Sequence, residues 1–471
     1  MHVRRPFART APSLALLLAV PTAAAQDSAS TLSSGDTAWL LTASALVMLM
    51  VPGLALFYGG MVRHKNIVST LLQCFLVLAL VSIQFAVVGY TLAFGPDVKG
   101  WGLIGGLDFA FLDGIGPHDA APLAPTVPHL AFVLFQAMFA AITPALIIGA
   151  FVERFSFKAV LVFTLLWATL VYDPVAHSVW GGGLLAQMGA LDFAGGTVVH
   201  LTAGVAALAC ALYVGRRKGF GQVEMKPNNI PLTVLGAGLL WFGWFGFNAG
   251  SAIASGGLAA VAFATTHLAA AGALLSWCGT EWLAKGKPSA LGAATGLVAG
   301  LVAITPASGF VTPMAAILIG LAVGPICYGA VVLVKHLLRL DDSLDAFGVH
   351  GVAGAFGSIA TGLFATPFVN GLARTGLLAT PDGGIGLTAS GMALLADQAL
   401  AVGAVAAYTL VATFALLWLT DRLIGLRVPA EAEQVGLDLY EHGEKAYHQA
   451  DLPAPVPAKV MRFTGHDGAG K

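Results

Sequence analysis

The chain of 471 residues is 57% hydrophobic and only 10% charged, and its formal net charge is −1. Soluble domains carry about 25% charged residues, and the mean hydropathy of +0.83 is typical of a membrane protein with many spans. A nucleic-acid-binding protein is excluded, because such proteins carry a basic patch or stripe.

The first 25 residues differ from the rest of the chain. A basic stretch, MHVRRPFAR, precedes the short apolar segment LALLLAV, and the small residues of TAAAQ follow. The apolar segment is too short to cross a bilayer, so this order predicts a cleavable signal peptide over residues 1–25. A retained first helix is the alternative interpretation.

Long apolar runs follow the predicted signal peptide. A membrane helix needs about 20 apolar residues, and on that basis we predict an all-α, polytopic membrane protein. Its transmembrane domain is predicted to cover residues 36–425, followed by a cytoplasmic tail over 426–471. The eleven predicted spans are 38–60, 66–94, 129–151, 157–178, 192–214, 228–251, 257–281, 289–308, 313–335, 346–365 and 395–422.

Lysine and arginine are distributed unevenly between the connecting loops. Cleavage of a signal peptide leaves the mature N-terminus outside, so alternate loops are predicted to be cytoplasmic, where positive charge is favoured. The outer loops carry only Lys99 and Arg374. The inner loops carry Arg63, Lys65, Arg154, Lys158, Arg216, Arg217, Lys218, Lys226, Lys285, Lys287, Lys335 and Arg339. This distribution predicts a multi-pass protein of the inner (plasma) membrane with a cytoplasmic C-terminus.

Two histidines, His200 and His350, lie in the fifth and tenth predicted spans, in the similar sequences VVHLTAG and GVHGVAG. Because five is odd, two consecutive five-helix units are inserted in opposite directions. We therefore predict a 5+5 inverted repeat over about 38–214 and 228–365, with one extra C-terminal helix, and expect the two histidines to meet. Ionisable residues at membrane depth indicate a functional site. The alternative is two structural histidines, each bound to a backbone carbonyl.

Aromatic residues with helical spacing lie in two other spans. Trp244, Phe247 and Ser251 stand at i, i+3 and i+7 in WFGFNAGS, and Phe135 and Phe139 stand at i and i+4 in FQAMF. Aromatic faces attract cations by about 0.5–2 kcal/mol, and a hydroxyl can accept a hydrogen bond from an ammonium group. The pattern is compatible with a site for a small cation, but aromatic residues that face lipid or the protein core have the same spacing.

Asp192 precedes His200 by eight residues in LDFAGGTVVH. Aspartate is a good helix N-cap, and its negative charge also favours a nearby cation; the two roles are compatible. No phosphate-binding loop, zinc signature or nucleophile motif is present in the sequence, so we predict no catalytic residues, no metal ligands, no cofactor and no enzyme activity.

Several motifs together resemble the ammonium transporters of the Amt/Mep/Rh superfamily, specifically the bacterial Amt branch. They are GLALFYGGMVRHKN at 53–66, WGGGLL at 180–185, DFAGGTVVH at 192–200, WFGFNAGS at 244–251, FGVHGV at 347–352 and GLDLYEHGEKAY at 436–447. The resemblance extends from about residue 36 to 447. It implies the ammonium-transporter fold, a homotrimer with one pore per subunit in membrane lipid, and a PII-type (GlnK-like) signalling protein as partner at the cytoplasmic face.

The resemblance also implies roles for residues within these motifs. Trp180, Phe139 and Ser251 match an outer site that recruits ammonium, and Phe135 and Tyr172 match supporting positions around its mouth.

Deeper positions match the pore of the same family. The resemblance implies that Phe139 and Phe247 close a phenylalanine gate. It also implies that Trp244 supports the pore. His200 and His350 match the twin-histidine pair that conducts ammonia, and Asp192 matches the essential acidic residue.

One position departs from the family pattern. The stretch YDPVAHSVW places Asp173 where the family is expected to carry an uncharged residue. A charge at the outer mouth would attract cations, whereas a solvated helix end would have no role in transport. Both interpretations stay open at this point.

The chemistry and the resemblance favour a transporter that recruits NH4+, deprotonates it and conducts NH3 for nitrogen uptake, because burying an unpaired charge costs many kcal/mol. We favour a proton relayed through the histidines, which makes transport electrogenic. One alternative is an ammonium sensor that signals through its tail. Another is an electroneutral gas channel of the Rh type, from which competition by the analogue methylammonium would distinguish an Amt protein.

Overall fold

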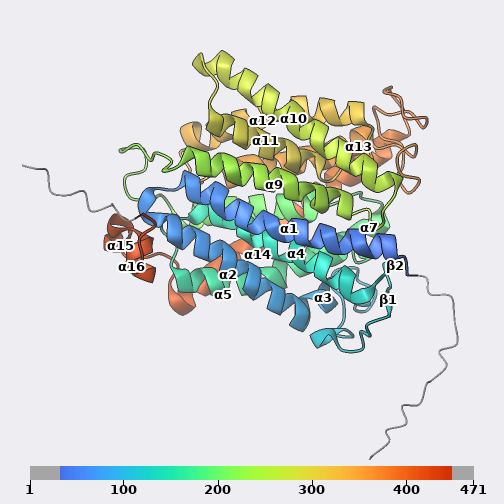
Figure 1. Cartoon of the computed structure of the whole chain (residues 1–471), viewed down its shortest axis with the longest axis horizontal. Helices are drawn as coiled ribbons and strands as arrows, with labels where there is room; N and C mark the ends of the chain where they lie inside the picture. Colours follow the sequence, from blue (N-terminus) through green and yellow to red (C-terminus); the bar gives the residue numbers. More distant parts are fainter. Residues whose placement is uncertain (1–31, 448–471) are drawn as a thin grey trace, which may run out of the picture. The chain divides into compact units, whose positions relative to one another are not determined.

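The computed structural model describes residues 32–447, so the predicted signal peptide and the end of the tail lie outside the described residues. The described part is a bundle of helices (Figure 1). Its α-helices are α1 (Ser34–Met61), α2 (Ile67–Gln84), α3 (Tyr90–Phe94), α4 (His129–Phe151), α5 (Phe157–Trp167), α6 (Asp173–Val179), α7 (Leu184–Met188), α8 (Thr202–Val214), α9 (Ile230–Gly250), α10 (Gly257–Lys285), α11 (Ala290–Ile304), α12 (Pro313–Val332), α13 (Val352–Phe364), α14 (Gly391–Ile424), α15 (Ala430–Val435) and α16 (Leu437–His442).

Short segments of tighter or wider helix adjoin several of these helices. π-Helical turns inserted in α-helices are frequent at functional sites, and here two of them contain His200 and His350. The 3-10 segments are η1 (His64–Asn66) and η3 (Ala110–Leu112); the π segments are η2 (Phe85–Gly89), η4 (Ala168–Tyr172), η5 (Gly196–Leu201), η6 (Leu333–Leu337) and η7 (Phe347–Gly351).

Ten helical stretches among the described residues are long and apolar enough to cross a membrane. The predicted eighth span corresponds to α11, an apolar helix of 15 residues, so the predicted count of eleven is not confirmed. This helix begins after the Ser289 cap and ends at Ile304, two residues before Pro306, which has no N–H to continue a helix. The prediction of a helical, multi-pass membrane protein is confirmed.

A small hairpin departs from the predicted all-helical fold. Strands β1 (Ala120–Ala121) and β2 (Ala124–Pro128) pair antiparallel in the long connection between α3 and α4. Outside a helix, backbone N–H and C=O groups need other partners, and this connection is long enough to pair with itself.

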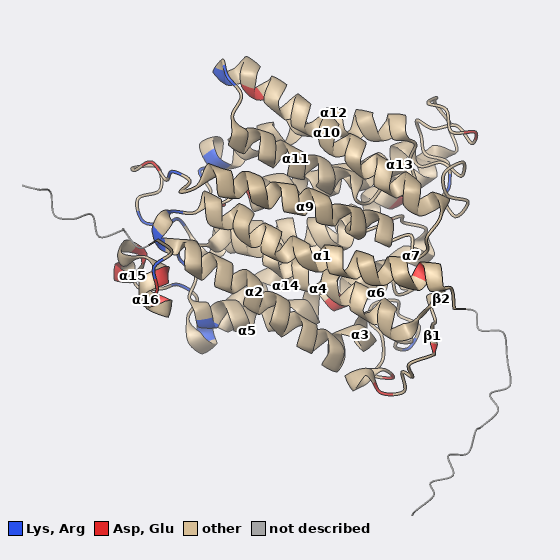
Figure 2. Ribbon diagram, in the orientation of Figure 1, with Lys and Arg blue, Asp and Glu red and all other residues tan. Residues whose placement is uncertain are grey.

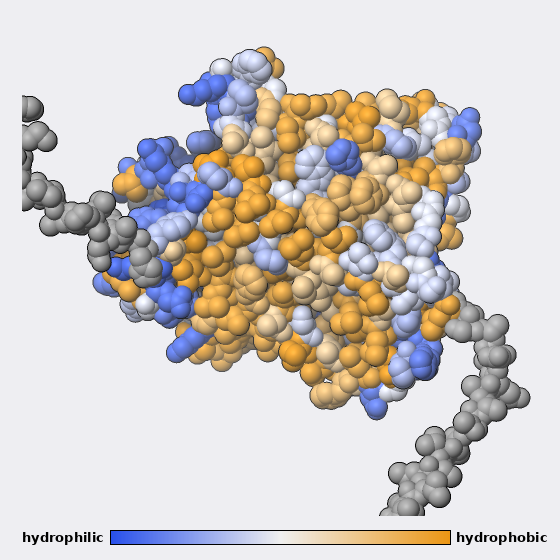
Figure 3. Space-filling view, in the orientation of Figure 1, coloured by the Kyte–Doolittle hydropathy of each residue, from blue (hydrophilic) through white to orange (hydrophobic). Residues whose placement is uncertain are grey.

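Charged and apolar surfaces occupy different parts of the bundle. Figure 2 shows lysine and arginine gathered at the end that carries α15 and α16. Between this end and the opposite one, which carries β1 and β2, the face in Figure 3 is largely hydrophobic over α1, α2 and α9. This distribution fits a membrane-embedded belt between two polar ends.

The two histidine-bearing segments pack against each other at the centre of the bundle. Helix α8 lies against η7, α13 lies against η5, and the two π segments also touch. The backbones meet at Gly204 and Gly351, where a Cβ atom on Gly204 would lie 2.1 Å from the Gly351 nitrogen. Only glycine permits this approach, which brings the preceding π-helical turns together.

Candidate functional site

His200 and His350 lie side by side in the interior of the bundle. Their ring centroids are 5.4 Å apart and the ring planes differ by 16°, and both side chains are buried. The Trp244 ring is also stacked with His200, at 5.2 Å. Among the described residues, neither ring nitrogen of His200 has a hydrogen-bond partner. The contact between the two imidazoles is therefore stacking, and no backbone carbonyl holds the His200 ring.

A narrow cavity of about 10 Å³ adjoins the two histidines. That volume holds a single water-sized molecule. The imidazoles are the only ionisable groups in its wall, which consists of Met50, Leu54, Phe57, Ile142, Leu146, His200, Leu240, Trp244, Phe247, Val298 and His350. The cavity can therefore admit a small neutral molecule and offer it ring nitrogens, but it offers no counter-charge to an ion.

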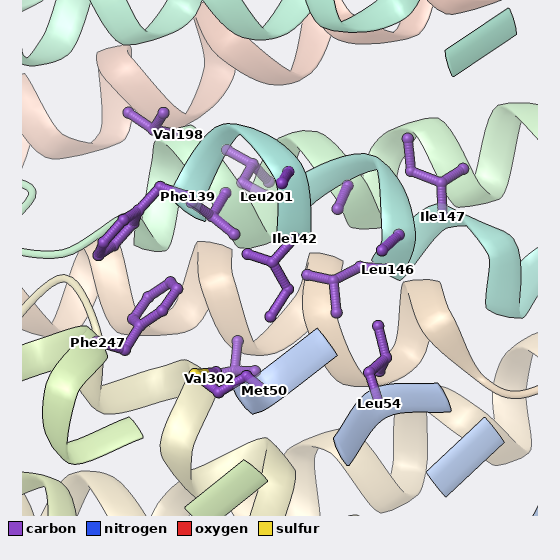
Figure 4. Packing of buried hydrophobic residues seen from close by; sticks show 14 of the residues in the cluster. Met50, Leu54, Phe139, Ile142, Leu146, Ile147, Val198, Leu201, Phe247 and Val302 are labelled. Atoms are coloured by element: carbon purple, nitrogen blue, oxygen red, sulfur yellow. The ribbon is translucent and has the colours of Figure 1, made fainter. Parts of the chain in front are cut away.

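Two stacked phenylalanines stand at one end of this cavity. The Phe139 and Phe247 ring centroids are 4.2 Å apart, with the planes 29° from parallel. In Figure 4, Phe139 from α4 lies beside Phe247 from α9, and Ile142 and Leu146 continue along α4 away from the ring pair. Phe247 lines the narrow cavity and Phe139 lines a second cavity, so the ring pair separates the two.

The second cavity has a volume of about 160 Å³ and a mostly aromatic wall. It is lined by Phe94, Leu123, Phe132, Gln136, Phe139, Trp180, Phe193, Ser251 and Ile253. The predicted residues Phe139, Trp180 and Ser251 are thus brought together, whereas Phe135 packs edge-on behind Phe139 at 4.9 Å.

Polar contacts orient two of the residues in this wall. The Trp180 indole N–H donates to the Asp192 carbonyl over 2.8 Å, and the Ser251 hydroxyl donates to the Phe247 carbonyl over 2.8 Å. Because the Ser251 proton is used in this way, its oxygen offers lone pairs as acceptors. Aromatic faces together with a hydroxyl acceptor suit a small cation with N–H donors.

Gln136, which was not predicted from the sequence, also lines the second cavity. Its side chain is buried, and its Oε1 atom lacks a hydrogen-bond partner among the described residues. Gln136 lies three residues before Phe139 in FQAMF, so it shares a helical face with that ring. That spacing was the available signal, and the residue adds a second potential acceptor for N–H groups.

Asp192 binds the start of the segment that carries His200. Its two carboxylate oxygens accept hydrogen bonds of 2.8–3.0 Å from the backbone N–H groups of Gly195, Gly196, Thr197 and Val198. Its role in this structure is therefore that of a cap for η5. The side chain is buried and is not part of either cavity wall.

Asp342, which was also not predicted from the sequence, is the counterpart of this cap. Its carboxylate accepts hydrogen bonds from the Ala346 and Phe347 backbone N–H groups over 3.1 and 2.8 Å. Asp342 precedes His350 by eight residues, as Asp192 precedes His200, so the repeated spacing was the available signal. Burial raises the pKa of Asp342 to about 7.

Two other positions considered in the sequence do not reach the second cavity. The interpretation of Asp173 as a solvated helix end was wrong, because its side chain is fully buried and its Oδ2 atom accepts a hydrogen bond of 2.8 Å from Gln84. Its attraction for cations stays a prediction, although the residue does not line this cavity. The preceding π segment η4 leads into α6 at this residue, and the carboxylate meets α2 instead of solvent. Tyr172 is also fully buried, and it is not part of the cavity wall.

A buried charge cluster lies near the end of the bundle that carries the tail. Glu153 is paired with Arg63 at 2.7 Å and with Arg217 at 2.9 Å, and Arg217 also forms a bidentate contact with Asp341. Burial raises the pKa of both carboxyl groups, but the neighbouring guanidinium groups outweigh this effect and hold each pKa below its ordinary value. The cluster joins the loops after α1, α4, α8 and α12.

The described part of the tail docks beside this cluster. The Lys65 ammonium donates to the Glu433 and Gln434 carbonyls over 2.7 and 2.6 Å. The Asp438 carboxylate accepts from the Ser69 backbone N–H over 2.8 Å. Helices α15 and α16 are therefore fixed to the first connecting segment of the bundle and to the first turn of α2.

Comparisons with known proteins agree with this geometry. The profile of the Ammonium Transporter Family matches residues 38–447. The chain is 48% identical over 416 residues to the ammonium transporter of Bacillus subtilis, an alignment that covers 88% of this chain and 99% of that protein. The crystal structure of Saccharomyces cerevisiae Mep2 is similar with a TM-score of 0.77 and 36% identity, over 85% of this chain and 89% of that one. A protein named Sensor Amt Protein is similar with a TM-score of 0.78 and 30% identity, over 87% and 98% of the two chains.

Proposed function

The chain belongs to the ammonium transporter family, a family of membrane transporters rather than enzymes, and we propose that it recruits NH4+ at the outer aromatic cavity and conducts NH3 past the twin histidines. One observation carries this proposal. His200 and His350 are the only ionisable groups in the wall of a narrow apolar cavity that lies behind a closed pair of phenylalanine rings.

Recruitment requires a site that prefers a cation to a neutral molecule. The Trp180 and Phe139 rings supply electron-rich faces, each worth about 0.5–2 kcal/mol to a cation. Ser251 and Gln136 supply oxygen acceptors for the N–H groups of the ion. We place the ammonium ion in this cavity of about 160 Å³, with these four residues as its ligands.

Passage beyond the phenylalanine gate requires the loss of a proton. Phe139 and Phe247 stack at 4.2 Å, so one ring must move before a molecule can pass. The space behind them offers no carboxylate, and an unpaired buried charge costs many kcal/mol. Ammonia is water-sized and neutral, and it can donate to and accept from imidazole nitrogens.

We propose that the proton is relayed through His200 and His350, which makes transport electrogenic. The nitrogens of His200, which have no hydrogen-bond partner among the described residues, and the adjacent ring of His350 support this route, because these nitrogens are available to exchange a proton with a molecule in the cavity. Asp192 supports the relay by fixing the backbone of η5, and Trp244 by stacking on His200.

We extend the proposal to the topology and the assembly. Reciprocal packing of η5–α8 and η7–α13 supports an inverted repeat, with α11 as the shortest of eleven spans. The charged end with α15 and α16 is proposed to be cytoplasmic, in an inner-membrane homotrimer whose tail contacts a PII-type partner. A cleaved signal peptide would place the mature N-terminus outside.

Uptake of labelled methylammonium into proteoliposomes tests the proposed function. We expect saturable uptake in the wild type that ammonium inhibits, and a weaker apparent affinity in Trp180→Leu. Methylammonium uptake that is unsaturable and insensitive to added ammonium would instead indicate a neutral gas channel. The exposed Trp101→Leu variant is the matched control, because that tryptophan lies outside the recruitment cavity.

A sensor is the second candidate function. The similarity to the Sensor Amt Protein and the docked tail favour it. A wild type that binds ammonium in the outer cavity but takes up neither ammonium nor methylammonium would establish a sensor in place of a transporter.

A further inference from the structure

A buried histidine outside the pore, His177, lies on α6 one turn before Trp180. Its side chain is fully inaccessible to solvent. The ring Nδ1 atom lies 3.1 Å from the Ala93 carbonyl oxygen, and the Nε2 atom lies 3.0 Å from Oδ1 of Asp97. The ring therefore bridges the end of α3 and the loop that follows it to the helix that leads to Trp180.

The two contacts determine which protons the His177 ring carries. A backbone carbonyl and a carboxylate oxygen are both acceptors without a hydrogen. A neutral imidazole has only one N–H, so it can satisfy one of these acceptors and would direct a lone pair at the other. With Asp97 ionised, both hydrogen bonds are made together only by the doubly protonated ring, which is then the imidazolium partner of an ion pair.

Asp97 connects this pair to both sides of the Trp180 turn. The same Oδ1 atom accepts a hydrogen bond of 2.7 Å from the Gly102 N–H, and the Gly102 carbonyl accepts one of 2.8 Å from the Leu184 N–H. Before the turn, the loop contacts His177 through Asp97. After the turn, it contacts Leu184 through Gly102. The outer loop thus clamps the chain segment that presents Trp180.

The turn has little space for any other arrangement. A Cβ atom on Gly181 would lie 2.3 Å from the Ala93 carbonyl oxygen and 2.7 Å from Nδ1 of His177. The Gly181 and Gly183 N–H groups both donate to the His177 carbonyl, over 3.0 and 3.1 Å. A displacement of His177 therefore also displaces the backbone of Gly181 and Gly183, and with it the adjacent residue Trp180.

We propose that the buried His177 and the half-buried Asp97 form an imidazolium–carboxylate pair that holds the Trp180 ring in the wall of the recruitment cavity. His177 is then a positioning residue for cation recruitment, an inference that rests on the proposed function. The pair itself is a property of the fold and can be tested without transport.

The charged surroundings of His177 are few among the described residues. Asp97 is the ionisable group in direct contact with the ring. The titratable groups on the elements packed against α6 and in the adjoining loops are Tyr90 on α3, Tyr172 on η4, His200 on η5, Lys99, Asp192 and, on α6 itself, Asp173. Asp173 is bound by Gln84, so Asp97 is the counter-ion.

The first experiment measures the protonation of the ring. Solid-state NMR of protein labelled with ¹⁵N-histidine in proteoliposomes is recorded at neutral pH, and the His177 signal is assigned by its absence in His177→Gln. We expect both ring nitrogens of His177 to be protonated in the wild type and a neutral ring in Asp97→Asn. A neutral ring in the wild type would overturn the ion pair.

The second experiment measures positioning through saturable methylammonium uptake. Because cation–π attraction corresponds to about 2- to 30-fold in affinity, we expect His177→Gln to raise the half-saturating concentration by about tenfold, with the maximal rate within about twofold of the wild type. The double variant with Trp180→Leu should show no further increase over Trp180→Leu alone, since both changes remove one interaction.

Controls separate positioning from folding and from the proposed function. His118→Gln, at an exposed histidine of the outer loop, should leave uptake unchanged. Additive effects in the double variant, or an equal loss of maximal rate and affinity in His177→Gln and Asp97→Asn, would contradict positioning. A wild type without uptake would refute the proposed function and with it the recruitment role, while the NMR result would still decide the ion pair.

Discussion

Substitution of Gly204 by alanine tests the packing that brings His200 and His350 together. A Cβ atom at this position would lie 2.1 Å from the Gly351 nitrogen and 2.2 Å from its Cα atom. Both are backbone atoms, so no side-chain rotation can relieve the contact. The segments that carry His200 and His350 must therefore separate until the distance exceeds 3.4 Å, the start of ordinary van der Waals contact.

The magnitude follows from two opposing effects. Overpacking of an interior costs about 1–3 kcal/mol, whereas replacing glycine by alanine within a helix contributes about 0.5–1 kcal/mol of stabilisation. We expect a net destabilisation of about 1–2 kcal/mol, since the clash involves backbone on both sides. Transport should fall by about tenfold or more, because the ring separation of 5.4 Å widens and misplacement by about 1 Å is costly for a relay.

Thermal unfolding in detergent and uptake into proteoliposomes measure the two effects. Gly403→Ala is the matched control, because a Cβ atom on this glycine of α14 would meet nothing within 4 Å. It should be neutral or slightly stabilising. Equal stability and equal uptake in Gly204→Ala and the wild type would refute the claim that this glycine contact determines the distance between His200 and His350.

Three further predictions concern carboxylates. Asp192→Asn should lower the free energy of unfolding by about 2–4 kcal/mol, measured by denaturation in detergent, because an amide NH2 replaces an oxygen that accepts two backbone N–H groups. Asp173→Asn should leave the half-saturating methylammonium concentration unchanged, because the residue is outside the recruitment cavity; a shift comparable to that of Trp180→Leu would contradict this. Since the folded-state pKa values of Glu153 and Asp341 are lowered, their contribution to stability is complete above the ordinary values and is lost as the pH falls through the folded ones. In an acid titration of thermal stability, Arg217→Met should be less stable than the wild type at neutral pH and should lose less stability as the pH falls, because the pKa values of the two carboxyl groups are then lowered less. Coincident curves would contradict the pairing.

Much of the bundle was predictable because membrane helices follow simple rules. The span predicted at 129–151 coincides with α4, and those predicted at 313–335 and 346–365 end within two residues of the observed helical stretches. The exception, α11, is short because Pro306 follows it, and an apolar count over 289–308 ignores this break.

The site was predictable where a periodic or repeated pattern marked it. The repeated sequence motif around His200 and His350 indicated their proximity. Helical spacing indicated that Phe247 and Ser251 lie on one face of their helix. The orientation of Asp173 was not predictable, because it depends on a π-helical turn that no residue pattern announces and on Gln84, 89 positions earlier in the chain. Partners that are distant in sequence escape local reasoning.

The same limit explains why the pair of His177 and Asp97 was not predicted. The two residues are separated by 80 positions, and neither lies in a repeated motif. Their contact depends on the loop after α3 folding over the Trp180 turn, which is fixed by the Gly102 and Leu184 backbone groups.

The most direct test of the proposed pore is the transient current on a solid-supported membrane after an ammonium jump, recorded with wild-type protein and with His200→Ala. The account predicts an inward positive current in the wild type that disappears in the variant at equal protein density. An unchanged current in His200→Ala would contradict the histidine relay. No current in the wild type, with the vesicle interior still turning alkaline, would show that ammonia crosses and leaves its proton behind.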